Sequence, residues 1–567
     1  MRWGDFWETA HPIHSLYTVS HPSPTFTSGN MPKPTLDYSL YLVTGRELLP
    51  PGKDYYESLE ESLQGGVTLV QVREKYADTG EFIEIARRTK TICDKYNVPV
   101  LINDRIDVHL AVGTAGIHVG QTDCPIGLAR SLVGPDAIIG LSVGNVNEAK
   151  RAIQQGADYV GIGAVWPTNS KDVTKKKMLG PDGVGEILDL LHGTGVQSVA
   201  IGGIHLPNVA QLLHASIAPQ SRNTLAGIAI ISDIVASPTP REAAKNLREV
   251  VQSFKRARSQ LANLEAVYGA NLFSSPRSVD GFIKEAVHLI DVIKRETPLV
   301  NQMTNNVVIN DSANVTLAIG ASPIMATHPR DVHDLSPAIG ALLINFGTIT
   351  DKAGMLVAGR QANINRKPII FDPVAIGATP YRQETSVELL AHWQPTIIKG
   401  NAGEIGFMAK STEVASRGVD SVGSGFSDPG AVVKALARKQ AAIIVLTGEH
   451  DYISDGSTTL KISNGHHYLE RITGSGCQLG SVIASFAATA RLEHLAKHGE
   501  WENASQLVQG DMLAAAVTGV LVYTIAAEVA AAREDVKGPG TFRAALIDEL
   551  YNLNPEVLRQ RAKIEIL

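Results

Sequence analysis

The chain has 567 residues, of which 44% are apolar and 19% are charged, and its formal net charge is -6 at neutral pH. This composition is typical of a globular protein with ample core and gives no sign of a nucleic-acid-binding surface. Three cysteines are too few for a disulfide framework, and no apolar run reaches the roughly 18–20 residues that span a bilayer. We therefore expect a cytoplasmic protein with no membrane segment and no nucleic-acid partner.

Residues 1–36 differ from the rest of the chain. They are rich in Pro, Ser, Thr and His, show little periodicity and contain no long apolar stretch. A secretory signal needs such a stretch. We therefore expect a poorly ordered extension before the first domain.

Between residues 37 and 238, short apolar runs recur about every 20 to 35 residues, and helical patterns separate most of them. The expected strands are Tyr38–Thr44, Thr68–Val72, Val98–Ile102, Gly116–Val119, Ile138–Val143, Tyr159–Gly163, Ser198–Ile201 and Gly227–Ile231. Eight strands that alternate with helices indicate a (β/α)8 TIM barrel.

Almost every expected strand ends in polar or glycine residues, and barrel enzymes build their sites at these C-terminal strand ends. Asp104 and Asp123 end neighbouring strands and could share Mg2+. The cationic candidates for a polyphosphate site are Arg73, Lys75 and Lys171. The candidates for a second, smaller anion are Thr168, Ser170, Gly203 and Ser232. Each could be a solvated loop residue, but together on one rim they favour joining two phosphorylated fragments.

This half resembles thiamine-phosphate synthase in Gln71-x-Arg73-x-Lys75, Asn103-Asp104, Gly120-Gln121-x-Asp123, Pro167-Thr168-x-Ser170-Lys171 and Gly202-Gly203-Ile204. The resemblance implies that hydroxymethylpyrimidine diphosphate loses pyrophosphate while a thiazole nitrogen attacks its methylene. It implies catalytic roles for Ser142 and Lys171, and Mg2+ on Asp104 and Asp123. The implied pyrimidine diphosphate site is Gln71, Arg73, Lys75, Asn103, Ser142 and Lys171. The implied thiazole phosphate site is Thr168, Ser170, Gly203, Ile231 and Ser232. Ser170 stands where the motif more often has Thr, and it keeps the hydroxyl.

Residues 239–279 begin with a polar helical pattern and end in Ser274-Ser275-Pro276, which predicts a helical linker. From residue 280 to 567, longer helical patterns alternate with apolar runs. The expected strands are Leu342–Asn345, Pro368–Phe371, Thr396–Ile398, Ile443–Leu446, Asp451–Ile453 and Leu460–Ser463. They predict a doubly wound α/β sheet with an antiparallel edge. An apolar stretch around Leu513 to Ala532 carries polar interruptions and suits a core helix.

The run Thr473-Gly474-Ser475-Gly476-Cys477 is the most informative stretch of the second half. Its two glycines let the backbone approach a ligand, and the residues after Cys477 predict a buried helix. A glycine-rich turn at a helix N-terminus is an anion site, because unpaired N–H groups and the helix dipole both face the ligand. An ordinary loop before a helix would look the same, so the run alone leaves both interpretations open.

Residues from about 281 to 555 resemble hydroxyethylthiazole kinase, of the ribokinase-like group. The segments that carry the resemblance are Thr304-Asn305, Gly320 to Met325, Lys399-Gly400-Asn401, the glycine run before Cys477, and Lys537 to Phe542. The implied thiazole pocket is Asn305, Met325, Gly347 and Gly474. The implied ATP site is Lys399, Thr447, Asp372 and Glu404, the last two in a magnesium and phosphate network.

The same resemblance implies ATP as co-substrate and a catalytic Cys477 beside the substrate hydroxyl. Ribokinase-like relatives usually have an Asp there, so Cys477 is either a general base or a closely packed neighbour. Lys399 departs from the Arg often found in bacterial relatives and loses bidentate binding. The family also implies a homo-oligomer built on kinase-domain trimers, either a trimer or a hexamer.

The fused order of the two halves resembles the fungal bifunctional enzymes of thiamine biosynthesis, with small-molecule substrates as partners. The kinase half would phosphorylate the thiazole alcohol, and the barrel would couple the product to the pyrimidine. Two alternatives stay open. The kinase could act on the pyrimidine alcohol instead, or one half could be an inactive scaffold or metabolite-binding module.

Overall fold

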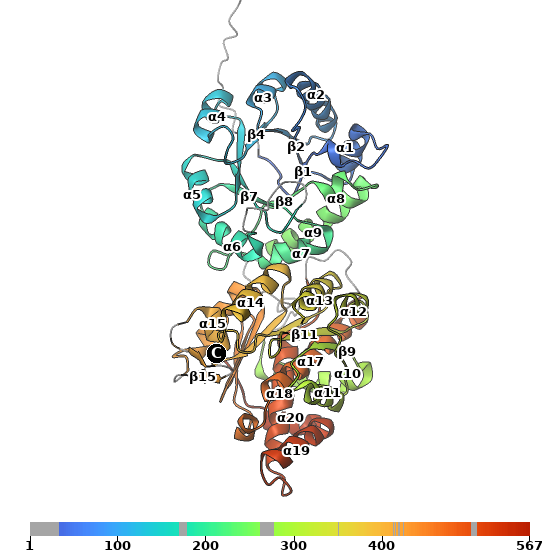
Figure 1. The fold of residues 1–567 in the computed structure, drawn as a ribbon, viewed down its shortest axis with the longest axis vertical. Helices are drawn as coiled ribbons and strands as arrows, with labels where there is room; N and C mark the ends of the chain where they lie inside the picture. Colours follow the sequence, from blue (N-terminus) through green and yellow to red (C-terminus); the bar gives the residue numbers. More distant parts are fainter. Residues whose placement is uncertain are drawn as a thin grey trace, which may run out of the picture.

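The computed structural model describes residues 33, 35–168, 178–260, 277–349, 351–411, 413, 415–417, 420–422, 425–499 and 507–567. These residues form two domains that stack along the long axis of the molecule (Figure 1). The first is a closed barrel, and the second is built on a nine-stranded sheet.

The barrel is closed by eight parallel strands in sequence order, with β1 paired to β8. They are β1 (Leu40–Val43), β2 (Leu69–Val72), β3 (Val100–Asn103), β4 (Gly116–Val119), β5 (Ile138–Val143), β6 (Tyr159–Ile162), β7 (Gln197–Ile201) and β8 (Gly227–Ile230). Every predicted barrel strand is confirmed to within a few residues.

Side chains alternate along each barrel strand between the interior and the surrounding helices. In β1, Tyr41 belongs to the small apolar cluster inside the barrel, whereas Leu40 and Leu42 pack outward under the helices. This interior cluster fills the part of the barrel farther from the C-terminal strand ends. The next inward positions, nearer the C-terminal strand ends, are therefore available to line a site.

The barrel helices are η1 (Arg46–Leu48), α1 (Tyr55–Gln64), α2 (Thr79–Lys95), α3 (Ile106–Val112), α4 (Ile126–Val133), α5 (Val146–Gln154), α6 (Gly180–Leu191), α7 (Leu206–Ala215), α8 (Ser232–Val235) and α9 (Pro240–Gln260). The predicted linker interval thus begins with α9, which packs beside α1 and α7. Its buried Leu247, Val251 and Phe254 join the apolar core of the barrel. Residues 261–276, the rest of that interval except 277–279, lie outside the described residues.

The second domain has a mixed sheet in the order β10-β9-β11-β12-β13-β16-β17-β18-β19. Its strands are β9 (Leu299–Met303), β10 (Ser322–Ile324), β11 (Ala341–Asn345), β12 (Ile369–Asp372), β13 (Ile397–Asn401), β16 (Ile443–Thr447), β17 (Asp451–Ser454), β18 (Thr459–Ile462) and β19 (Ile564–Ile566). A separate hairpin pairs β14 (Ala415–Arg417) with β15 (Asp420–Val422). In the nine-stranded sheet, β9 to β13 and β16 are parallel and β17 to β19 are antiparallel, so the predicted antiparallel edge is confirmed.

Helices cover both faces of this sheet, and each face has its own apolar cluster. The helices are α10 (Val279–Glu296), α11 (Ile309–Ala318), α12 (Pro329–Leu335), α13 (Lys352–Ile364), α14 (Pro380–His392), α15 (Ala402–Ala409), α16 (Pro429–Gln440), η2 (His467–Arg471), α17 (Ser475–His498), α18 (Met512–Ala531), α19 (Pro539–Asn552) and α20 (Pro555–Arg561). Within the described part of the chain, α18 alone is long and apolar enough to span a membrane, and 89% of its most apolar window is buried in the fold. It is the predicted core helix.

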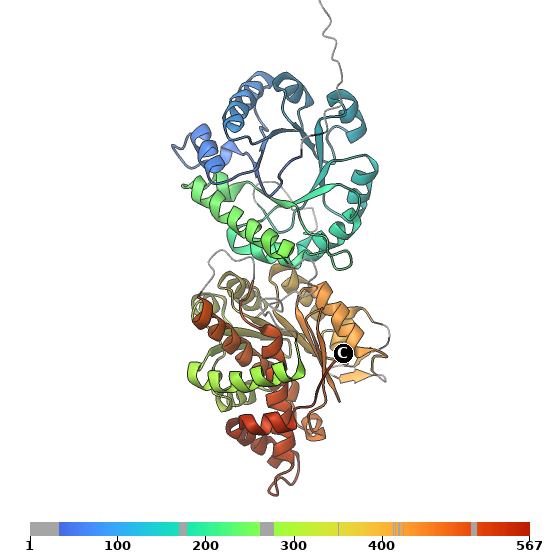
Figure 2. The same cartoon turned by 180° about the vertical axis from the view of Figure 1, so that it is seen from behind.

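The two domains meet where α6 and α7 of the barrel lie over α14 and α13 of the second domain, as both views show (Figures 1 and 2). Leu507, from the segment before α18, is 3% exposed and packs into the apolar cluster of the barrel. The indole of Trp166 donates a hydrogen bond of 2.7 Å to the carbonyl of Ala391 in α14. The interface therefore combines apolar packing with a directional contact.

Candidate active sites

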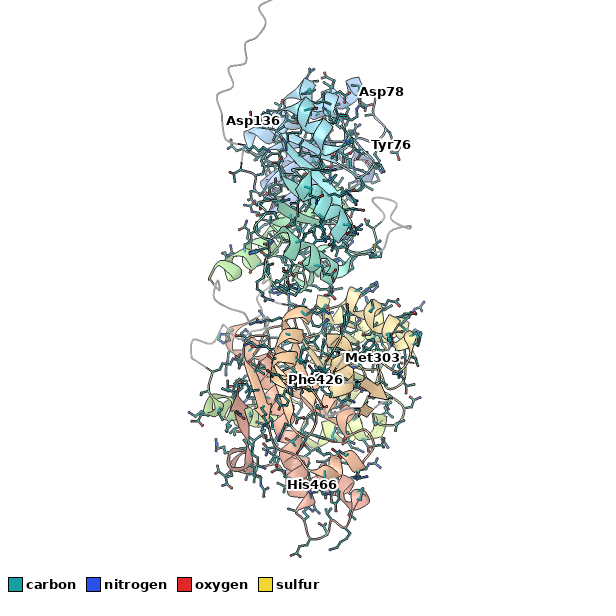
Figure 3. The ribbon with its side chains drawn as sticks, turned by 90° about the vertical axis from the view of Figure 1, so that its left-hand side faces the viewer. Tyr76, Asp78, Asp136, Met303, Phe426 and His466 are labelled. Atoms are coloured by element: carbon teal, nitrogen blue, oxygen red, sulfur yellow. The ribbon has the colours of Figure 1, made fainter. Side chains whose placement is uncertain are left out.

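A cavity opens inside the barrel at the C-terminal ends of its strands. Figure 3 views the barrel from the side, with Tyr76, which follows β2, at one rim and Asp136, which precedes β5, toward the other. The predicted site residues that line the cavity are Gln71, Arg73, Asn103, Ser142, Thr168, Gly203, Ile231 and Ser232. The cavity is thus lined by most residues of the predicted pyrimidine diphosphate site and most residues of the predicted thiazole phosphate site. These residues lie on or after strands β2 to β8.

A chain of buried hydrogen bonds crosses the floor of this cavity. Gln71 Nε2 donates to the Tyr41 hydroxyl at 2.6 Å, and the hydroxyls of Tyr41 and Tyr159 lie 2.9 Å apart. The imidazole of His118 joins the Tyr159 hydroxyl at 2.8 Å to Ser142 Oγ at 2.9 Å. Burial raises the pKa of Tyr41 and of Tyr159, so both phenols stay neutral. This floor links Gln71 to Ser142 and fixes their orientation.

The sequence interpretation missed Tyr41, His118 and Tyr159. All three occupy inward positions on their strands: Tyr41 and His118 line the cavity, and Tyr159 lies two residues before the cavity-lining Gly161. The alternation of side chains along β1, β4 and β6 could have identified them. Every second side chain of a barrel strand faces the interior, so inward positions next to the C-terminal strand ends also face the cavity.

Another part of the cavity lining is a glycine turn that follows β7. Gly202 and Gly203 both have positive φ, at +98° and +67°, which favours glycine. A Cβ on Gly203 would lie 2.6 Å from the Pro167 carbonyl oxygen, so the turn packs closely against the segment that carries Thr168. Asn208 Nδ2 donates to the Gly203 carbonyl at 2.9 Å and secures the turn. Its backbone, Thr168 and Ser232 together offer an anion site.

The rim of the barrel carries the predicted metal ligands. Asp104 follows β3 and Asp123 follows β4, and these strands are paired through Asn103 and His118. Asp104 is exposed, while Asp123 accepts a hydrogen bond from the Gly120 N–H at 2.6 Å. An exposed and a half-buried carboxylate at neighbouring strand ends suit a hard cation that also binds phosphate oxygens. Lys75, which follows β2, is exposed. Ser170 and Lys171 lie outside the described residues.

In the second domain, a buried polar cluster forms around Cys477. Asn305 Nδ2 donates to Asn345 Oδ1 at 3.0 Å, and Asn345 Nδ2 lies 3.2 Å from Cys477 Sγ. Asn345 Nδ2 also donates to Asp372 Oδ2 at 2.8 Å, and Lys399 Nζ lies 3.2 Å from Asp372 Oδ1. Lys399 Nζ donates to the Gly476 carbonyl at 3.0 Å. The ends of β11, β12 and β13 thus meet the first turn of α17.

Burial controls the ionisation of this cluster. It raises the pKa of the Cys477 thiol to about 11, because the neutral form is favoured away from water and Asp372 adds negative charge. Burial also raises the pKa of Asp372. For Lys399, burial acts to lower the pKa, but the carboxylates of Asp372 and Glu404 outweigh it and raise the pKa. An ammonium among buried carboxylates is an electrostatic centre for a phosphate group.

Two further acidic groups lie near the ends of β13 and β16. Glu404 accepts the N–H groups of Ala375 and Asn401 at 2.9 and 2.8 Å, and burial raises its pKa to about 7. Asp451, which the sequence interpretation missed, accepts the Gly448 N–H at 3.2 Å, and burial raises its pKa to about 7. Asp451 therefore holds the turn that follows Thr447, a predicted ATP contact.

The predicted thiazole residues surround the same strand ends. Asn305 follows β9, Met325 follows β10 and Gly347 follows β11. A Cβ on Gly347 would collide with the Asn305 side chain, so glycine is required for their close approach. Gly474 has φ +77° and is the N-cap of α17, and a Cβ there would collide with Val308. The predicted glycine turn at a helix N-terminus is therefore present.

Comparison with known proteins identifies both halves. Residues 40–234 match the thiamine monophosphate synthase family, and residues 290–556 match the hydroxyethylthiazole kinase family. The fold and these two matches thus define a fused enzyme, with a synthase barrel followed by a kinase domain of a family that implies ATP as co-substrate.

Relatives with the same fusion cover nearly the whole chain. This chain is 40% identical over 551 residues to the probable thiamine biosynthetic bifunctional enzyme of Schizosaccharomyces pombe. The alignment covers 94% of this chain and 99% of the relative. It is 37% identical to the thiamine biosynthetic bifunctional enzyme of Saccharomyces cerevisiae, covering 92% and 96%. The kinase half alone is 40% identical to the hydroxyethylthiazole kinase of Desulforudis audaxviator, covering 48% and 93%. The chain belongs to the family of thiamine biosynthetic bifunctional enzymes.

Proposed function

We propose that the kinase domain transfers a phosphoryl group from ATP to the hydroxyl of hydroxyethylthiazole, and that the barrel couples the resulting thiazole phosphate to hydroxymethylpyrimidine diphosphate. The products of the second step are thiamine phosphate and pyrophosphate. One observation carries this proposal: Arg73 and the glycine turn at Gly203 line the same cavity in the barrel. Two anion sites in one cavity suit the joining of two phosphorylated fragments.

In the barrel, the bond between the pyrimidine methylene and the diphosphate oxygen breaks, and a bond from that carbon to the thiazole nitrogen forms. The hydrogen-bonded floor holds Gln71 and Ser142 in place, and these two side chains together with Asn103 would orient the pyrimidine diphosphate. Arg73 is 8% exposed and, with Lys75 and Lys171, would balance the charge of the departing pyrophosphate. The thiazole phosphate would bind at Thr168, Ser170, Gly203, Ile231 and Ser232.

We assign a Mg2+ site to Asp104 and Asp123. Their oxygen donors and their position at neighbouring strand ends fit this ion, which usually takes one or two carboxylates together with substrate phosphate oxygens. A bound Mg2+ would offset negative charge on the pyrophosphate leaving group. Asp104 has φ +61°, so its backbone also favours Asp or Asn at this rim position.

In the kinase domain, Asn305, Met325, Gly347 and Gly474 would border the thiazole, with Cys477 beside its hydroxyl. The N-terminus of α17 and the ammonium of Lys399 would stabilise the transferred phosphoryl group. Thr447 would contact ATP, and Asp372 and Glu404 would organise Mg2+ and phosphate. The mixed sheet with helices on both faces supports assignment to the ribokinase-like group.

A coupled assay with thiazole alcohol, pyrimidine diphosphate, ATP and Mg2+ tests the proposal. We expect thiamine phosphate from the wild-type chain and no product if the function is wrong. Asp104→Asn should abolish the synthase step and spare the kinase, and Cys477→Ala should do the reverse. Asn keeps the backbone preference at position 104, so a loss there reports the missing charge. If neither variant changes turnover, the site assignment is wrong.

Competition settles the alternative kinase substrate. With both alcohols present, we expect phosphorylation of the thiazole alcohol to dominate; preferential phosphorylation of the pyrimidine alcohol would contradict the assignment. An inactive half would show as a missing half-reaction when the two steps are run separately.

We further infer a cytoplasmic homo-oligomer built on kinase trimers. Three apolar side chains on or beside α11 support a subunit contact there: Val307 is 69% exposed, Ile309 41% and Leu317 57%. Light scattering of the purified chain should give three or six copies. A monomer at micromolar concentration would overturn this inference.

A further inference from the structure

We propose that the kinase domain holds part of the synthase site in position, through the hydrogen bond from the Trp166 indole to the Ala391 carbonyl. Trp166 is thereby a positioning residue for thiazole phosphate. The inference rests on the proposed assignment of Thr168 and Gly203 to that substrate. It concerns a contact between residues 225 positions apart, on opposite sides of the domain boundary.

The acceptor is a carbonyl that needs a partner. Ala391 lies in the last turn of α14, and the last carbonyls of a helix have no intrahelical N–H to accept from. Trp166 is only 7% exposed, so its indole N–H also needs an acceptor inside the protein. At 2.7 Å the bond satisfies both groups at once. It therefore fixes the indole relative to the kinase domain.

The backbone of Trp166 is tied to the glycine turn of the synthase. Its N–H donates to the Gly202 carbonyl at 3.1 Å, and the N–H of Val165 donates to the Ile201 carbonyl at 3.1 Å. A Cβ on Gly203 would lie 2.8 Å from the Trp166 Cβ. The turn and the tryptophan thus have little room to move independently.

The returning chain is held at the same place. The N–H of Gly180, at the start of α6, donates to the Val165 carbonyl at 3.0 Å. A Cβ on Gly180 would lie 3.7 Å from the Ala391 Cβ, so α6 begins in van der Waals reach of α14. Ala391 therefore accepts from Trp166 on the segment that leaves β6 and also lies close to the start of α6.

These contacts connect the kinase domain to the substrate in two short steps. Ala391 holds the indole of Trp166, and Trp166 holds Gly202 and Gly203 while leading directly into Pro167 and Thr168. Gly203 and Thr168 both line the cavity. A phenylalanine could fill the same space but could not donate to Ala391. The N–H is therefore the part of the side chain that links the domains.

The test is Trp166→Phe in the full-length chain. We expect KM for thiazole phosphate in the synthase reaction to rise about 3–10-fold, the range that one net hydrogen bond provides. KM for pyrimidine diphosphate and the kinase constants should change less than about twofold, since Gln71 and Asn103 lie on β2 and β3. An unchanged KM for thiazole phosphate, or equal rises in both synthase KM values, would overturn the proposal.

Trp393→Phe is the matched control. Trp393 lies two residues from Ala391, is fully buried, and its indole N–H has no hydrogen-bond partner among the described residues. The same substitution there loosens the kinase core without removing the link, and should leave the synthase KM for thiazole phosphate unchanged. A rise equal to that of Trp166→Phe would refute a specific role for Trp166.

If Trp166→Phe does not fold, benzothienylalanine at position 166 keeps the shape of the indole and replaces only the N–H with sulfur. The same selective rise in KM is expected. Synthase activity of the wild-type chain, measured in parallel, keeps this test separate from that of the proposed function.

Discussion

Among single residues, the ionisation of the Cys477 thiol is set by its buried surroundings. Burial raises the pKa of its thiol to about 11, so the thiolate becomes steadily more abundant as the pH rises toward that value. If the thiolate is the base, kcat/KM of the kinase reaction should rise about tenfold per pH unit between about pH 7 and 9. Cys477→Asp should remove this rise and keep activity at neutral pH. A flat wild-type profile would instead make Cys477 a packed neighbour.

Gly347 is the second residue whose role follows from contact. A Cβ there would collide with Asn305, which holds Asn345 and lies 3.4 Å from Cys477 Sγ. Gly347→Ala should therefore lower kinase kcat/KM by about 100-fold, in keeping with displaced positioning groups, and spare the synthase. Gly540→Ala is the control, because its Cβ would meet nothing within 4 Å. Equal kinase activity in both variants would contradict this reading of the pocket.

At the scale of elements, the turn between β16 and β17 carries a buried charge. Burial raises the pKa of Asp451 to about 7, above its unfolded value, so the folded state loses stability as the pH rises from about 4 to 7. Asp451→Asn removes this cost and keeps the oxygen that accepts from Gly448. We expect the gain in free energy of unfolding of this variant over the wild type to grow by about 2 kcal/mol between pH 5 and 7 and to level off above. An advantage independent of pH would exclude a buried carboxylate.

Strand periodicity explains which elements the sequence predicted. All eight barrel strands and β11, β12, β13 and β16 were apparent, because buried parallel strands are continuous apolar runs. The antiparallel strands β17 and β18 were also predicted, whereas the short β14–β15 hairpin was not. Strands β9, β10 and β19 were also missed. In β9, Asn301 and Gln302 interrupt the apolar pattern. Both are buried and satisfied in the fold: Asn301 accepts from the Ala326 N–H, and Gln302 bonds Thr316 and Ser481. Their partners lie far along the chain, so no local pattern could reveal them.

At the scale of the whole molecule, the two sites lie in different domains, each with its own strands and cavity walls. Thiazole phosphate made by one chain should therefore be usable by another. A mixture of Asp104→Asn and Cys477→Ala should form thiamine phosphate after a lag that shortens with enzyme concentration. Absence of product from the mixture, with each variant active in its own half-reaction, would show obligatory transfer within one chain.

Local periodicity and motifs at strand ends were enough to predict the two domains, the order of the barrel strands and eight of the residues that line the barrel cavity. Packing in three dimensions sets how Asn305, Asn345 and Cys477 meet, how burial raises the pKa of the Cys477 thiol, and that the Trp166 indole donates to the Ala391 carbonyl. These features depend on packing between distant segments and on exclusion of water, and neither is expressed in the spacing of neighbouring residues.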